Sequence, residues 1–224
     1  MNKKTKIILI IFFTLFSFII IFTTYCGFDR YLSILLYSKY SNNNKYIKNY
    51  NKLNEFSPKQ SNIIISLSAN YEELNKIKSC INSILDQTIR INKIYLFVIG
   101  NNDLQDIPAY LKEIVIIVPT KDYKDNTKII PILIKEKEAD TIILSLENNI
   151  IYGKDFIEIM LEEMIKNQNT ILIDSKNTCI LFKPLYFNTE IINKKYFIND
   201  NKIIENIENN KIINYNENYK MFNI

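Results

Sequence analysis

A long uncharged stretch near the N-terminus limits what this chain can fold into more than any other sequence feature. Residues 7–28 read IILIIFFTLFSFIIIFTTYCGF and contain no Asp, Glu, Lys or Arg. At about 1.5 Å per residue, a helix of this length covers the roughly 30 Å hydrocarbon core of a bilayer. We therefore expect a transmembrane signal-anchor helix over 7–28, with the membrane as one partner of the chain.

The residues on either side of this helix indicate its orientation in the membrane and whether it is cleaved. The preceding residues 1–6, MNKKTK, carry three lysines and no acid. This predicts a basic cytoplasmic tail and a domain on the non-cytoplasmic side of the membrane. A cleaved signal peptide is the alternative, but its apolar core usually has about 7–15 residues and is followed by small ones. The longer run here, with Thr-Thr-Tyr-Cys near its end, favours an uncleaved single-pass anchor.

Residues 29–61 form a juxtamembrane segment and a stem in this interpretation. Residues 31–40, YLSILLYSKY, are apolar and aromatic, which suits either a helix at the membrane interface or a helix packed on the globular domain. Residues 41–61 are polar and rich in Asn and Lys, with Pro58 near their end. Such a composition is typical of a stem that holds a domain away from a membrane.

Composition excludes several classes of function. The 224 residues include no histidine, and none of the 3 cysteines forms a CxxC pair. These facts exclude His-dependent nucleophilic catalysis, His-bearing zinc signatures and a disulfide framework. With only 3 glycines there is no GxGxxG or P-loop motif. The N-terminal tail supplies most of the net charge of +4, and no basic stripe follows it, so we expect no nucleic-acid partner.

From residue 62 onward, short apolar runs alternate with helical patterns, which predicts an α/β fold. Strand-like runs occupy 63–67, 93–99, 114–118 (ended by Pro119), 141–146, 170–173 and 179–182. Helical patterns lie between them, at 71–86 (with a capping box at Asn70 and Glu73), 104–112, from about Pro131, and at 155–167. We expect a mainly parallel sheet with helices on both faces, followed by a solvated helix and an irregular C-terminal tail.

Ligands of such sheets bind beyond the carboxyl ends of the strands. The informative residues are therefore the polar ones that follow each strand. They include Ser66 and Ser68 after the first strand, the segment 119–128 after the third, and Glu147-Asn148-Asn149 after the fourth.

Three stretches resemble the family-2-like glycosyltransferases of the GT-A fold. Residues 64–68 (IISLS), 79–88 (SCINSILDQT) and 94–96 (IYL) resemble the first strand, the S-L-L-x-Q-T helix end and the second strand of that group. Residues 122–131 (DYKDNTKIIP) resemble its D-Y-G-P-x-T-K-x-x-P segment, with Lys-Asp in place of Gly-Pro. Residues 142–152 (IILSLENNIIY) resemble I-I-x-x-x-D-D-D-I-I-Y.

The resemblance covers residues 62–185 and implies a Rossmann-like GT-A domain over 62–224. Such a domain transfers a sugar from a nucleotide-diphospho-sugar donor to a glycan or glycoprotein acceptor. In this family Mn²⁺ or Mg²⁺ neutralises the diphosphate, and a downstream carboxylate acts as general base. Carried over by position, the metal ligands are Glu147 and Asn149, the residues that bind the nucleotide sugar are Ser66, Ser68, Asp122, Lys128 and Asn148, and the base is Asp200.

The acidic motif is degenerate, which leaves alternatives open. Glu147-Asn148-Asn149 supplies one negative charge where three acids would supply three, so metal binding should be weaker. The chain is then either an enzyme, an inactive GT-A relative that binds a nucleotide or a partner, or an unrelated anchored α/β protein. For the individual residues, the alternatives are a polar turn at 147–149, a turn cap at Asp122 and a helix N-cap at Asp200. For the other candidates they are a solvated surface charge at Lys128 and ordinary strand-end hydroxyls at Ser66 and Ser68.

Overall fold

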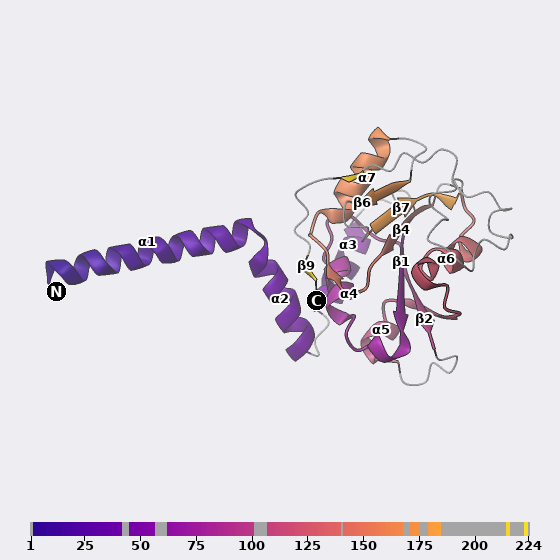
Figure 1. Ribbon diagram of the computed structural model, residues 1–224, viewed down its shortest axis with the longest axis horizontal. Helices are drawn as coiled ribbons and strands as arrows, with labels where there is room; N and C mark the ends of the chain where they lie inside the picture. Colours follow the sequence, from indigo (N-terminus) through magenta and orange to yellow (C-terminus); the bar gives the residue numbers. More distant parts are fainter. Residues whose placement is uncertain are drawn as a thin grey trace.

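The protein consists of an α/β body and one long helix that projects from it (Figure 1). The computed structural model describes residues 2–41, 45–56, 62–100, 107–139, 141–167, 171–174, 179–184, 214–215 and 222–223. Asp200, the predicted general base, lies outside these residues.

A seven-stranded sheet forms the centre of the body, in the order β3-β2-β1-β4-β7-β6-β8. The strands are β1 (Ile63–Asn70), β2 (Lys93–Ile99), β3 (Ile116–Thr120), β4 (Ile142–Leu146), β6 (Leu172–Asp174), β7 (Cys179–Phe182) and β8 (Asn214–Tyr215). β1 runs parallel to β2 and β4, and β2 runs parallel to β3. β7 runs antiparallel to both of its neighbours, while β6 and β8 are parallel. The mostly parallel sheet confirms the predicted fold class.

Helices cover both faces of this sheet, as predicted. They are α4 (Lys78–Leu85), α5 (Ala109–Lys112), α6 (Ile130–Lys135) and α7 (Phe156–Lys166). Alternate residues of β1 point to opposite faces: Ile65 and Leu67 join the core that contains α4, α5 and α7 residues, whereas Ile64 joins the core under α6. By the same alternation, Ser66 and Ser68 lie on the α6 face.

Two elements near the C-terminus were not predicted. β8 extends the main sheet, and β9 (Phe222–Asn223) pairs with β5 (Ile150–Ile151) in a separate two-stranded sheet. Both lie where we expected an irregular tail. Strands of two residues carry no periodicity, so their pairing follows from tertiary contacts that the sequence pattern does not reveal.

The N-terminal helix α1 (Lys3–Tyr25) is long and apolar enough to cross a membrane. None of its residues is buried against the body. A membrane anchor and a signal sequence share this length and composition. Gly27 separates α1 from α2 (Phe28–Tyr40) with a left-handed backbone, φ 69°, a conformation that glycine adopts without steric cost.

The segment expected to contain a stem is packed on the body. Of the two alternatives for 31–40, the structure shows packing on the domain, because Ile34 of α2 is fully buried in the core beside α4. A further helix, α3 (Lys45–Phe56), also contacts α4, with Tyr46 buried and the Tyr50 hydroxyl donating to the Ile91 carbonyl. Its tyrosines give α3 an apolar face, so these residues differ from the solvated spacer that we expected.

Two further differences concern where elements end. The capping box at Asn70 and Glu73 is present, but it starts a 3₁₀ turn (Tyr71–Glu73), and α4 begins only at Lys78. Pro119 does not stop β3, which continues to Thr120. β3 is an edge strand of the described sheet, the kind of strand in which proline is tolerated.

Candidate functional site

The turn after β4 lies at the carboxyl edge of the parallel strands. β4 pairs with β1 in parallel, with Ser145 opposite Ser66, so both strands end at the same edge of the sheet. Glu147 and Asn148 are half-buried in this turn and Asn149 is exposed. The edge rule therefore places the predicted turn beside the end of β1, where we expected it.

A hydrogen-bonded chain joins β1, the start of α6 and this turn. The buried Ser66 hydroxyl donates to the backbone carbonyl of Lys128. The Lys128 ammonium forms an ion pair with the Glu147 carboxylate. The Lys128 side chain is only 8% exposed, whereas that of Glu147 is 43% exposed. The cation is thus enclosed by the protein, and the carboxylate faces solvent.

Asn148 connects the same turn to β1 directly. Its Nδ2 atom donates to the Ser68 carbonyl at 2.8 Å. The structure therefore brings together five predicted residues: Ser66, Ser68, Lys128, Glu147 and Asn148. Their binding roles stay predictions.

Asp122 has a local structural task in the segment that leads to Lys128. Its Oδ1 accepts hydrogen bonds from the Lys124 backbone N–H at 2.6 Å and from the Thr127 hydroxyl at 3.4 Å. This is the turn cap that we weighed as the alternative to a nucleotide contact. Thr127 is fully buried and its hydroxyl also donates to the Lys124 carbonyl, so the turn holds the residue that precedes Lys128.

Lys124 has a left-handed backbone, with φ 55°, and is the only non-glycine residue with positive φ in the described part of the chain. It occupies the position where the D-Y-G-P-x-T-K segment has glycine. Glycine adopts this conformation freely, whereas a side chain strains it. The backbone thus agrees with the resemblance at a position where the residue type does not.

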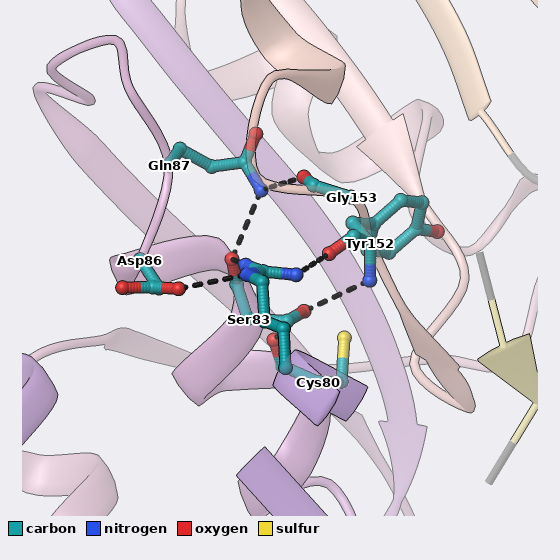
Figure 2. Close-up of polar contacts among 7 residues, drawn as sticks. Cys80, Ser83, Asp86, Gln87, Tyr152 and Gly153 are labelled. Carbon is teal, nitrogen blue, oxygen red and sulfur yellow. Dashed lines mark hydrogen bonds and ion pairs between the residues drawn. The ribbon is translucent and has the colours of Figure 1, made fainter. Parts of the chain in front are cut away.

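A buried polar clip holds the loop that follows β5. Gln87 donates from Nε2 to the carbonyls of Ser83 (2.9 Å) and Gly153 (2.6 Å), and its Oε1 accepts from the Ile157 backbone N–H at 3.1 Å. The Ser83 hydroxyl accepts from the Tyr152 backbone N–H at 3.1 Å (Figure 2). The end of α4 and the start of α7 are therefore tied to the same loop.

Tyr152 connects this loop to the candidate site through hydrogen bonds to the Glu147 backbone. Its hydroxyl accepts from the Glu147 backbone N–H at 2.9 Å and donates to the Glu147 carbonyl at 3.2 Å. Burial raises the pKa of Tyr152 well above its ordinary value, so the phenol stays neutral and can donate. Burial likewise raises the pKa of the Cys80 thiol to about 12. Cys80, which contacts the Glu147 carbonyl, is therefore a neutral packing residue and no nucleophile.

Arg30 of α2 docks on the same loop from the other side. Its Nε atom pairs with Asp86 at 2.8 Å, and its guanidinium also donates to the carbonyls of Tyr152 (2.6 Å) and Ser83 (3.4 Å). A cavity of about 340 Å³ lies beside Arg30, lined by Gly27, Thr88 and other residues of the α1–α2 junction and the loop after β5. This cavity is not at the Lys128–Glu147 pair, so it does not support the predicted donor site.

The sequence interpretation assigned no role to Gln87, Ser83 or Tyr152, although all three lie in the matched stretches. Their places in the S-L-L-x-Q-T and I-I-Y patterns were the available signal. Ser145 was also missed. Its buried hydroxyl lies on the α6 face next to Ser66 and makes no hydrogen bond with the described residues.

The residues described at this turn fit a divalent cation poorly. Mg²⁺ prefers an octahedral set of oxygen ligands, usually one or two carboxylates together with waters and the phosphates of a substrate. Glu147 is the one carboxylate in the 147–149 turn, and it is paired with Lys128. Among the residues that the structure describes, no three His, Cys, Asp or Glu side chains gather in a metal-binding group. The metal therefore stays a prediction from the family pattern.

We predict that Gln87→Met lowers the free energy of unfolding by about 2–6 kcal/mol. The Gly153 carbonyl and the Ile157 N–H each lose the Gln87 partner, at about 1–3 kcal/mol per buried group, while the Ser83 carbonyl keeps Arg30. Gln87 is 3% exposed and serves three backbone groups. Urea unfolding of the full chain in detergent, followed by circular dichroism, measures the change. The control is Thr88→Val, which removes an exposed hydrogen bond to Glu158. Equal losses of unfolding free energy in the two variants would contradict the stabilising role of the Gln87 hydrogen bonds.

We predict that Lys124→Gly raises the free energy of unfolding by about 0.5–1 kcal/mol. The relief of a left-handed side chain, about 1–2 kcal/mol, exceeds the added unfolded-state entropy, about 0.4–1 kcal/mol. The matched control Lys121→Gly changes an exposed residue without positive φ and should lower stability. The same urea unfolding measurement compares the two variants. A loss of stability in Lys124→Gly would show that the backbone at Lys124 is not strained.

Comparison with known proteins adds one structural likeness. No family model and no curated protein matches the chain. The crystal structure of the apo-form glycosyltransferase GlyE from Streptococcus pneumoniae TIGR4 is similar to 67% of this chain, with 16% sequence identity and a TM-score of 0.43. The match spans 41% of the length of the GlyE chain. A likeness of this degree carries no argument about activity, so the functional argument depends on the site residues.

Proposed function

We propose that this chain is a membrane-anchored, glycosyltransferase-like protein that binds a nucleotide-diphospho-sugar at the carboxyl edge of β1 and β4. One observation carries the proposal: the contact between Lys128 and Glu147 joins two stretches, 122–131 and 142–152, that resemble the family separately. The sheet brings the ends of these strands to one edge, and the ion pair adds a direct contact between the two stretches there. This edge is where open α/β sheets bind their ligands.

The proposed chemistry is sugar transfer with inversion to a glycan or glycoprotein acceptor. Departure of the nucleotide leaves negative charge on the diphosphate, and a nearby cation stabilises that charge. In this proposal Lys128 meets the diphosphate, and Ser66, Ser68, Asp122 and Asn148 contact the rest of the donor. Asp200 is the proposed general base for the acceptor hydroxyl. In the version taken from the family pattern, Glu147 and Asn149 hold Mn²⁺ or Mg²⁺.

The proposal includes a topology. The helix α1 is the single-pass anchor, the basic tail of residues 1–6 is cytoplasmic, and the body lies on the non-cytoplasmic side. The support is the length and apolar character of α1 together with the lysines before it.

A second candidate function is that of a catalytically silent relative. It is favoured by the ion pair at Glu147, which engages the single carboxylate of the turn, and by the two amides that follow it. Such a protein would bind a nucleotide or a partner without turnover. Binding and turnover therefore need separate tests.

The binding test uses calorimetry of the full chain in detergent with a panel of UDP- and GDP-linked hexoses and N-acetylhexosamines, each with Mn²⁺ and with EDTA. We expect at least one donor to bind. Ser68→Phe should weaken that binding by at least about tenfold, equivalent to about 1.4 kcal/mol, because the ring would occupy the end of β1. The control Asn51→Phe adds the same ring at an exposed position on α3. A folded chain that binds no donor would overturn the proposal.

The turnover test concerns Asp200. For a donor that binds, we expect Asp200→Asn to lower kcat by about 10²–10⁴-fold, the usual contribution of a general base. The donor Kd should change by less than about twofold, since a general base acts on the acceptor hydroxyl. Release of the free nucleotide in the presence of acceptor glycans measures the rate. The control is Asp125→Asn, which neutralises an exposed acid. Binding without any turnover by the unaltered chain would favour the silent relative.

A further inference from the structure

The buried charged side chain at the candidate site is that of Lys128, which is positive. The Lys128 side chain is 8% exposed, and its backbone carbonyl accepts the buried Ser66 hydroxyl. The preceding Asn126 and Thr127 are buried as well. The backbone of Lys128 is therefore held at the edge of the sheet by its own segment, and its ammonium contacts Glu147.

The Glu147 carboxylate carries the negative charge at the site, and it is the more exposed partner of the ion pair. The Glu147 backbone is held by Tyr152, but its side chain is 43% exposed. Turning this carboxylate into solvent would leave the buried Lys128 ammonium without that partner, which is costly unless another anion replaces it. An incoming anion with more charge can then take its place on Lys128.

The neighbouring amides add no negative charge for a cation site. Asn148 donates from Nδ2 to the Ser68 carbonyl and Asn149 is exposed, and both side chains are neutral. Within the described residues, no acidic cluster lies at hand to add the missing charge. The donor set thus disagrees with the divalent metal that the GT-A pattern implies.

We propose that Lys128 supplies the positive charge that the diphosphate requires, and that nucleoside diphosphates bind to this chain without a divalent metal. Glu147 occupies Lys128 in the absence of ligand and is displaced by the diphosphate. The inference rests on the proposed function, because it concerns the same site. The inference and the family pattern predict opposite effects of replacing Glu147 on nucleotide affinity. Here Glu147 competes with the ligand for Lys128, so its loss strengthens binding. In the family pattern it is a metal ligand, so its loss weakens binding.

The test is calorimetry of the full chain in detergent with UDP and with GDP, first in excess EDTA and then in excess Mn²⁺. We expect binding in EDTA, with a change in Kd below about twofold on adding Mn²⁺. Glu147→Gln should tighten binding by about 2–5-fold, the scale of a released, partly exposed ion pair. Lys128→Met should weaken it by about 10–100-fold, the scale of a lost charged hydrogen bond.

Two controls keep the outcomes distinct. Lys137→Met removes the same charge at an exposed position and should leave Kd unchanged. Glu147→Gln alters a partly exposed side chain, so its result stands even where Lys128→Met fails to fold. Binding that requires Mn²⁺, or that Glu147→Gln weakens, would overturn the metal-free inference and leave the proposed function intact. Failure of a folded chain to bind either nucleotide under both conditions would overturn both.

Discussion

The candidate site depends on one buried amide. Gln87 makes three hydrogen bonds to backbone groups of α4, α7 and the loop after β5, and a buried amide is tolerated only when its bonds are made. The loop is therefore fixed in one position. Tyr152, whose ring packs against Phe156 at 4.9 Å between centroids, is thereby aimed at the backbone of Glu147. Residues that touch no ligand thus set the shape of the turn that would touch one.

This dependence gives the family-like pattern a physical meaning. The Q-T helix end and the I-I-Y run are far apart in sequence, yet Gln87 and Tyr152 belong to one polar network (Figure 2). The glycine position of the D-Y-G-P segment is the position where this backbone is left-handed, at Lys124. The network supports the turn that presents Glu147, Asn148 and Asn149, so these widely separated stretches have a structural role in this chain.

Sequence periodicity was sufficient for the fold class, because a run such as 63–67 is apolar on both faces and lies beside amphipathic helices. It was insufficient wherever an element owes its state to a distant neighbour. Pro119 is accommodated because β3 is an edge strand, and α3 is packed because α4 presents an apolar surface to it. The same division holds at the site. The edge rule placed Ser66 near Glu147, but the ion pair of Glu147 with Lys128 depends on side-chain directions that spacing does not contain.

The docking of Arg30 determines how the body is joined to the N-terminal helix α1. Through Arg30, the 13-residue helix α2 is bonded to the loop that carries Tyr152, so the body is not suspended from a flexible tether. A helix of 13 residues is about 20 Å long. If α1 spans a bilayer, the body is then joined to it through Gly27 and a helix that packs on the body, so the body would stay close to the lipid surface.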